Sequence, residues 1–273
     1  MKLWQKNQPP NKKIDHFTVG KDREYDLHLA PFDCQASIAH AQMLVESGVL
    51  NLEEADKLVG VLNDLKDEVK KGNFAIEAEF EDVHSKIEYV LTQKLGDLGK
   101  KIHTARSRND QVLVALHLYL KAEIETIKKL THSFFKLLMD LADQHKDKLL
   151  PGYTHFQVAM PSSFGLWFSA YAESLIDDVT LLNGAHRIVD QNPLGSAAGF
   201  GSSFPIDRKA TTESLGFGDL KYNVIAAQMS RGKAEKTTAT AIASLAATLS
   251  KMSMDICLYM GQEHNFISFP EEF

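Results

Sequence analysis

Apolar residues recur at helical spacing along almost the whole chain, and the strict alternation that marks β-strands is nearly absent. Glycine and proline divide this pattern into segments, because both residues interrupt helices. We therefore predict an all-α fold. The predicted helices cover residues 26–47, 51–72, 82–95, 110–150, 161–191 and 230–259, and a further short helix begins near Asp207.

The ends of these segments carry residues that are typical of helix caps. Asn51, with Glu54 three positions later, predicts an N-cap closed by a capping box. Asp82 is suited to capping the third helix, and Pro161 to the first turn of the fifth. Helix ends can therefore be predicted at several places from local sequence.

The predicted helices become longer at about residue 110. Residues 110–150 contain neither glycine nor proline and permit one helix of about 60 Å. We predict a small helical N-terminal domain over residues 1–109 and part of a long-helix bundle over residues 110–273, incomplete at its C-terminal end. The wide apolar faces of such helices often continue across subunits, so we expect an oligomer.

Composition narrows the classes of partner. The 273 residues carry a net charge of −6, which disfavours nucleic acid and anionic membranes because both attract a basic surface. We find no signal peptide and no run of about 18 uninterrupted apolar residues, and expect a soluble cytoplasmic protein. Cys34 and Cys257 form no disulfide framework, and no histidine or acid spacing predicts a metal site.

A basic cluster precedes the longest predicted helix. It comprises Lys100, Lys101, His103, Arg106 and Arg108. Such a cluster is often a solvated surface. In the functional interpretation, the arginines, Ser107 and Asn109 bring guanidinium, hydroxyl, amide and backbone N–H donors to a helix start, which suits a carboxylate-bearing small molecule. Asp110 is expected to cap the helix rather than to contact an anion.

His155 lies in a segment that glycine and proline mark as a loop between two long helices. It is either an ordinary histidine or a group that donates or relays a proton near neutral pH, with Thr154 and Gln157 fixing the substrate. Residues 193–205, rich in glycine and serine, either approach a ligand closely or form a flexible connection. His84 faces either a site or solvent.

These motifs together resemble argininosuccinate lyase, a family of the fumarase/aspartase superfamily. The resemblance rests on EDVHSKIE at 81–88, LGKKIHTARSRNDQ at 98–111, PGYTHFQVAMP at 151–161 and PLGSAAGFG at 193–201. Other members share Thr-His-x-Gln-x-Ala-x-Pro. Tyr153 and the SRNDQ run favour the argininosuccinate branch.

The resemblance implies an anti β-elimination that splits argininosuccinate into arginine and fumarate, a step of arginine biosynthesis. It also implies a cytoplasmic homotetramer that needs neither a metal nor a redox cofactor. The residues implicated in binding the succinate part are Ser107, Arg108, Asn109 and Thr154, with His155 as the histidine of proton transfer.

The chain departs from the family pattern at several positions. Asp22 stands at a substrate-binding position where many members have serine, and Ala105 stands where glycine is frequent. Residues 1–273 also lack the Gly-Ser-Ser-x-Met-Pro-x-Lys loop whose serine is usually taken as the base, so we expect these residues alone not to turn over substrate. The alternatives are another superfamily lyase, such as adenylosuccinate lyase, and a non-catalytic scaffold resembling the lens crystallins.

Overall fold

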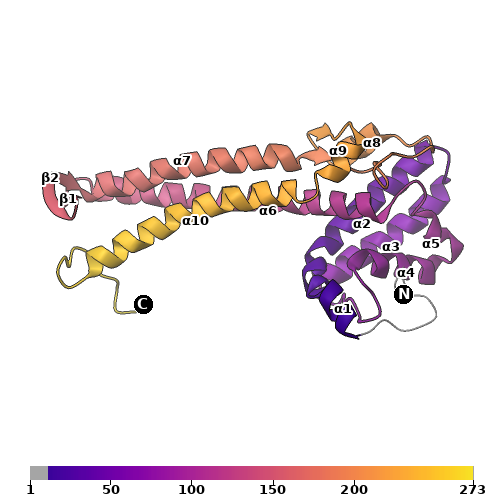
Figure 1. Cartoon of the computed structure of the whole chain (residues 1–273), viewed down its shortest axis with the longest axis horizontal. Coiled ribbons are helices and arrows are strands. Elements are labelled where there is room, and N and C mark those ends of the chain that lie inside the picture. Colours follow the sequence, from indigo (N-terminus) through magenta and orange to yellow (C-terminus); the bar gives the residue numbers. More distant parts are fainter. Residues whose placement is uncertain (1–11, 273) are drawn as a thin grey trace. The chain divides into compact units, whose positions relative to one another are not determined.

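The computed structural model describes residues 12–272 and confirms the predicted helical fold class (Figure 1). These residues also form two small two-stranded sheets. The helices are α1 (Lys12–Val19), α2 (Asp22–Glu46), α3 (Leu52–Lys70), α4 (Val83–Leu95), α5 (Asp97–Lys101), α6 (Arg108–Gln144), α7 (Phe164–Val189), α8 (Arg208–Ser214), α9 (Val224–Met229) and α10 (Lys233–Met260). The strands are β1 (Leu149–Thr154), β2 (Gln157–Ser163), β3 (Gln191–Asn192) and β4 (Asp219–Leu220).

The chain forms two compact units that interleave in sequence. Unit 1 contains the residues up to Lys121 together with Val189–Ala234, and unit 2 contains Ala122–Ile188 and Glu235–Phe273. The sequence predicted one boundary after residue 109. The segment 189–234 joins unit 1 because its apolar residues pack on α2 and α6, in a cluster of Ala36, Ala39, Val114, Leu118, Leu194, Leu215 and Phe217.

The core of unit 1 lies mainly among α2, α3 and α4, whose apolar faces bury leucine and isoleucine side chains. The predicted caps of two of these helices are confirmed. Asn51 Oδ1 accepts from the Glu54 N–H at 2.9 Å, and Glu54 Oε2 accepts from the Asn51 N–H at 3.1 Å. Asp82 Oδ1 accepts from the Ser85 N–H at 2.8 Å. Local polar contacts therefore fix where α3 and α4 begin.

The core of unit 2 lies among α6, α7 and α10. It contains Leu138, Tyr171, Ala172, Leu175 and Met252, with further aromatic residues packed around them. Asp255 of α10 accepts hydrogen bonds from Trp167 Nε1 at 3.0 Å and from the Tyr171 hydroxyl at 2.6 Å. These polar contacts set the register of α7 against α10 inside an otherwise apolar core.

The helix α10 also leaves much apolar surface uncovered. By length and composition alone it could cross a membrane, with a mean hydropathy of 1.3 over its most apolar 18-residue window, but helices of protein cores pass the same test. Only 11% of that window is buried. An apolar helix that its own chain does not cover is typical of a surface that packs against a partner.

The largest departure from the predicted fold is the segment 149–163, which forms an antiparallel β-hairpin (Figure 1). The prediction that Pro161 begins a helix is wrong: Pro161 pairs with Pro151 across the hairpin, and α7 begins at Phe164. Neither proline can donate a ladder hydrogen bond, so their position opposite each other costs little. Three short helices, α1, α5 and α9, were also not predicted.

Candidate functional site: the start of a long helix and a histidine hairpin

The segment before α6 places several donors at the helix start. The Ser107 N–H donates to Asp110 Oδ1 at 2.8 Å, and the Asn109 N–H is 3.3 Å from Ser107 Oγ. This reciprocal arrangement is that of a helix N-cap, so the capping role predicted for Asp110 is confirmed. The Asn109 side chain is exposed. The α6 start therefore presents an amide and a hydroxyl where the helix dipole favours an anion.

Arg108 is held by the N-cap residue of α4 and by side chains within that helix. Its Nη1 lies 2.9 and 2.8 Å from the two Asp82 carboxylate oxygens and 2.8 Å from Ser85 Oγ, and its Nη2 lies 3.4 Å from Glu88 Oε2. Burial alone would raise the pKa of Asp82, but the Arg108 guanidinium and neighbouring groups lower it below its usual value. Arg108 thus brings positive charge to the start of α6, although several of its guanidinium N–H groups already donate to Asp82, Ser85 and Glu88.

A buried polar network lies beside this helix start. His84 Nδ1 is 3.0 Å from Asp33 Oδ2, Gln111 Nε2 donates to both Asp33 oxygens at 3.0 and 3.2 Å, and Arg106 Nη1 donates to Ser37 Oγ at 2.8 Å. All five side chains are buried. His84 therefore faces the interior rather than solvent.

Sequence reasoning missed Asp33 and gave Gln111 no role of its own. The available signal for Asp33 was an acid inside a run of small and apolar residues on α2, since such acids are almost never buried without a partner. Through Gln111, this network fixes the first turn of α6 to α2.

The glycine-rich segment is a fixed loop of unit 1. The Gly195 and Ala197 N–H groups donate to Asp110 Oδ2 at 3.0 and 2.9 Å. Gln228 Nε2 donates to Ser196 Oγ at 2.9 Å and to the Ala197 carbonyl at 3.1 Å. Arg208 Nε donates to the Leu194 carbonyl at 2.8 Å. Because of these contacts, the glycine-rich segment is not a flexible connection.

His155 lies at the tip of the β1–β2 hairpin in unit 2. Thr154 pairs with Gln157, so His155 and Phe156 form a two-residue turn, with φ of 51° and 59°. Such turns normally contain asparagine and glycine, because other residues are strained at positive φ. The side chains of these two residues and of the flanking Thr154 and Gln157 are all exposed. The backbone thus holds His155 outward at a cost that suggests a functional role for the turn.

The predicted site residues divide between the two units. Ser107, Arg108 and Asn109 belong to unit 1, as does Asp22, an exposed residue that begins α2. Thr154, His155 and Gln157 belong to unit 2. The structure therefore shows two groups of candidate residues, which we call the α6 group (Ser107, Arg108 and Asn109) and the hairpin group (Thr154, His155 and Gln157).

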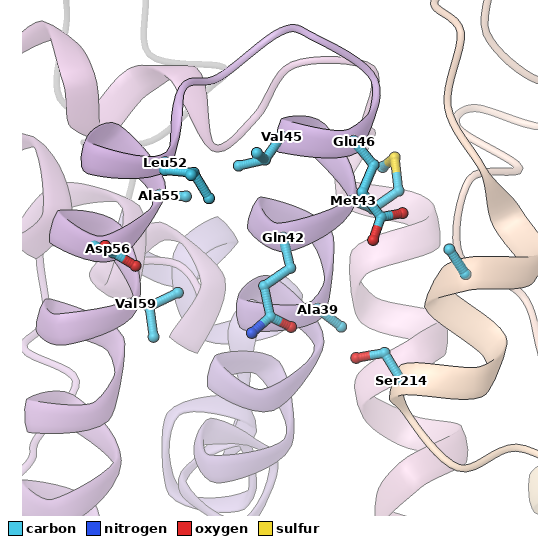
Figure 2. Close-up of a pocket in the computed structure, with 11 residues that line it drawn as sticks. Ala39, Gln42, Met43, Val45, Glu46, Leu52, Ala55, Asp56, Val59 and Ser214 are labelled. Atoms are coloured by element: carbon cyan, nitrogen blue, oxygen red, sulfur yellow. The ribbon is translucent and has the colours of Figure 1, made fainter.

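A pocket of about 480 Å³ lies among α2, α3 and α8, all in unit 1 (Figure 2). Its polar rim includes Gln42, Glu46, Asp56 and Ser214, and apolar side chains line the rest. None of the residues predicted to bind substrate lines this pocket. Among residues 12–272, no group of three or more histidine, cysteine or acidic side chains could hold a metal ion.

Comparison with known proteins assigns the chain to an enzyme family. A sequence model of the family described as Lyase matches residues 6–272, and the chain belongs to this family. The argininosuccinate lyase of Parabacteroides distasonis is 53% identical over 272 residues, which are 100% of this chain and 61% of that protein. Those of Bacteroides fragilis and Stenotrophomonas maltophilia are 51% and 41% identical, each over 99% of this chain. The chain spans 61% to 63% of the length of these relatives.

Solved structures support the same helical fold. An EDDS lyase variant with bound fumarate matches with a TM-score of 0.79 at 24% identity, over 88% of this chain and 47% of that one. A fumarate lyase:delta crystallin from Brucella melitensis, bound to cobalt, matches with a TM-score of 0.76 at 17% identity, over 92% of this chain and 60% of that one. At these identities the likeness concerns the fold alone.

Proposed function

We propose that this protein contributes to a cytoplasmic argininosuccinate lyase, which cleaves argininosuccinate into arginine and fumarate in arginine biosynthesis. The observation that carries the proposal is the identity of 50% or more to several relatives named argininosuccinate lyase, over 99% or more of this chain. The α6 group and the hairpin group lie within this match. The α6 group lies at a helix start, where the dipole favours an anion, and the hairpin group presents an exposed imidazole.

In the proposed reaction, a base removes a proton from the carbon next to a carboxylate, and negative charge spreads onto that carboxylate. Fixed donors that meet this charge stabilise the transition state. Ser107 and Asn109 supply a hydroxyl and an amide at the positive end of α6, Arg108 adds charge, and Thr154 adds a second hydroxyl. No step of this elimination requires a metal or redox group.

His155 is proposed to move a proton in this reaction. It is exposed at the tip of a turn whose backbone is strained. Its imidazole is proposed to donate a proton to the leaving guanidino nitrogen or to relay a proton from the base. The serine base that the resemblance implies belongs to a loop motif that residues 1–273 do not contain.

We also propose that the protein assembles as a homotetramer. Large apolar side chains are exposed along the helices of unit 2, including Leu137, Leu166, Ile176, Leu249 and Met254. Exposed apolar surface on this scale is typical of subunit interfaces. In such an assembly, residues from different copies could complete one active site.

Fragment complementation tests the proposed activity. Residues 1–273 alone are expected to release no fumarate from argininosuccinate. Mixing them with a fragment of a relative that carries the serine loop and the following helices should restore release. A His155→Asn change should then lower turnover by about 10² to 10⁴, because it removes the ionisable group.

The same assay distinguishes the alternatives. Turnover of adenylosuccinate in place of argininosuccinate would identify another lyase of the superfamily. A well-assembled mixture that turns over neither compound would favour a non-catalytic scaffold. Turnover by residues 1–273 alone would contradict the proposed role of the loop serine.

A further inference from the structure

The carboxylate of Asp110 joins two segments that are far apart in sequence. It is fully buried and accepts three backbone hydrogen bonds. Its Oδ1 accepts from Ser107 at 2.8 Å, and its Oδ2 accepts from Gly195 at 3.0 Å and from Ala197 at 2.9 Å. One side chain therefore fixes the start of α6 to the glycine-rich loop.

The loop adopts a backbone shape that needs this support. Gly195 has a φ of 81°, and Ala197 has a φ of 51°, which is strained for a residue with a side chain. An added Cβ at Gly195 would lie 2.7 Å from Arg208 Cγ, so the loop passes close to α8. Strained backbone persists only where the surroundings hold it, and clusters at functional sites.

We propose that Asp110 is a positioning residue for anion binding by the α6 group. Its carboxylate sets the place of Ser107, and through the first turn that of Asn109, against the loop of residues 194–197. This proposal rests on the proposed function and adds that the glycine-rich loop is part of the substrate site. The ligand class is a dicarboxylate such as the fumarate end of the substrate.

A carboxylate is required at this position because both of its oxygens face N–H donors. In an Asp110→Asn protein, the amide nitrogen would have to face either Ser107 or the pair Gly195 and Ala197. Either orientation sets donor against donor and releases one of the two segments. The change keeps the size of the side chain, so its effect reports on the hydrogen bonds.

Asp207→Asn provides a matched control in the same unit. Asp207 also accepts two backbone hydrogen bonds through one oxygen, from Lys209 at 2.8 Å and Ala210 at 3.1 Å, but it caps α8 and contacts neither Ser107 nor the loop of residues 194–197. Both variants remove the negative charge of a capping side chain, but an asparagine at position 207 keeps the single accepting oxygen that Asp207 uses. Only Asp110→Asn disturbs the link between α6 and the loop.

The experiment compares fumarate affinity by calorimetry and amide hydrogen exchange in the loop for the wild type and both variants. We expect Asp110→Asn to weaken fumarate binding by roughly tenfold or more and to speed exchange at Gly195 and Ala197. Asp207→Asn keeps an accepting Oδ1, so it should leave fumarate affinity and exchange at Gly195 and Ala197 unchanged. Unchanged affinity in Asp110→Asn with a released loop would overturn the positioning role, as would equal weakening by both variants.

Fumarate affinity in a second variant and the kinetics of the complemented enzyme test the same role of Asp110. If Asp110→Asn does not fold, Asp110→Glu keeps the charge and both acceptors but displaces the loop, and wild-type affinity in that variant would overturn the proposal. In the complemented enzyme, Asp110→Asn or Asp110→Glu should raise KM and change kcat little, because His155 and the base are untouched. A wild type that binds no fumarate would instead contradict the proposed function itself.

Discussion

Backbone strain in the described chain concentrates in the segments that the sequence singled out. Five non-glycine residues have positive φ, and four of them lie in those segments: Ala105, His155, Phe156 and Ala197. Each such residue costs about 1 to 2 kcal/mol relative to an ordinary conformation. Strain that recurs at the α6 start, the hairpin tip and the glycine-rich loop supports a shared functional purpose.

Replacing Ala105 by glycine should stabilise the protein. Ala105 has a φ of 59°, a conformation that glycine adopts without strain. We expect the free energy of unfolding to rise by roughly 0.5 to 1 kcal/mol in urea denaturation, since the relieved strain exceeds the added flexibility of the unfolded chain. Ala122→Gly, at an exposed position inside α6, should instead lose about 1 kcal/mol. Equal losses in both variants would contradict the strain at Ala105.

Two buried histidines should respond to pH in opposite directions. Burial alone would lower the pKa of His84, but Asp33 outweighs it and raises that pKa above 6.5. The pair therefore stabilises the fold fully below pH 6.5, and this stability is lost as pH rises through the raised pKa. For His40, burial and then Arg106 lower the pKa to about 3, so its contribution is present above pH 6.5 and is lost as pH falls.

Melting temperatures across pH test these signs. The loss of melting temperature in His84→Gln, relative to the wild type, should shrink as pH rises from about 6 to about 9. The loss in His40→Gln should grow as pH rises from about 4 to about 7. Losses that do not change with pH, or that change in the reverse direction, would show that these imidazoles do not have the assigned charges.

At the scale of elements, the sequence predicted those helix starts that depend on contacts between residues close together in the chain. Asn51, Glu54 and Asp82 cap helices through residues at most three positions away, so their pattern is visible in the sequence. The β1–β2 hairpin was missed because Pro151, Gly152 and Pro161 are typical of loops and its strands do not alternate. Asp33 and Gln111 meet across 78 positions, which no local pattern indicates.

The close packing of α5 against α4 depends on a glycine. A Cβ on Gly99 would lie 2.4 Å from the Leu91 carbonyl oxygen and 2.6 Å from the Thr92 nitrogen, and backbone atoms cannot move aside cheaply. We expect Gly99→Ala to lower the free energy of unfolding by about 2 kcal/mol. Gly60→Ala in α3, where nothing lies within 4 Å, should raise it by about 1 kcal/mol. A neutral Gly99→Ala would contradict this contact between α4 and α5.

At the scale of the whole molecule, the boundary predicted after residue 109 places the α6 group and the hairpin group in different domains, and in the structure they lie in different units. The α6 group and the hairpin group were each visible as a cluster of polar residues at a helix boundary. The prediction lacked the return of residues 189–234 to unit 1. That return depends on packing between distant segments, which a single sequence does not reveal.

The exposed apolar faces of unit 2 predict self-association. Light scattering after size-exclusion chromatography should give a mass of several chains at micromolar concentration. Met254→Asp should shift the protein towards smaller species, because it places a charge on an exposed apolar position of α10. Asp64→Lys, a charge change at an exposed position on α3 of unit 1, should leave the mass unchanged. A folded monomer of the wild type would contradict the proposed assembly.

The most direct test of the central claim is a fumarate titration of the wild type and of Asn109→Ala. The account predicts that the wild type binds fumarate and that the variant loses roughly ten- to a hundredfold in affinity. Because the Asn109 side chain is exposed, the free energy of unfolding should stay within about 0.5 kcal/mol of the wild type. Asn183→Ala, at an exposed position on α7, should bind as the wild type does. Equal fumarate affinity in the wild type and Asn109→Ala would contradict the assignment of anion binding to the α6 group.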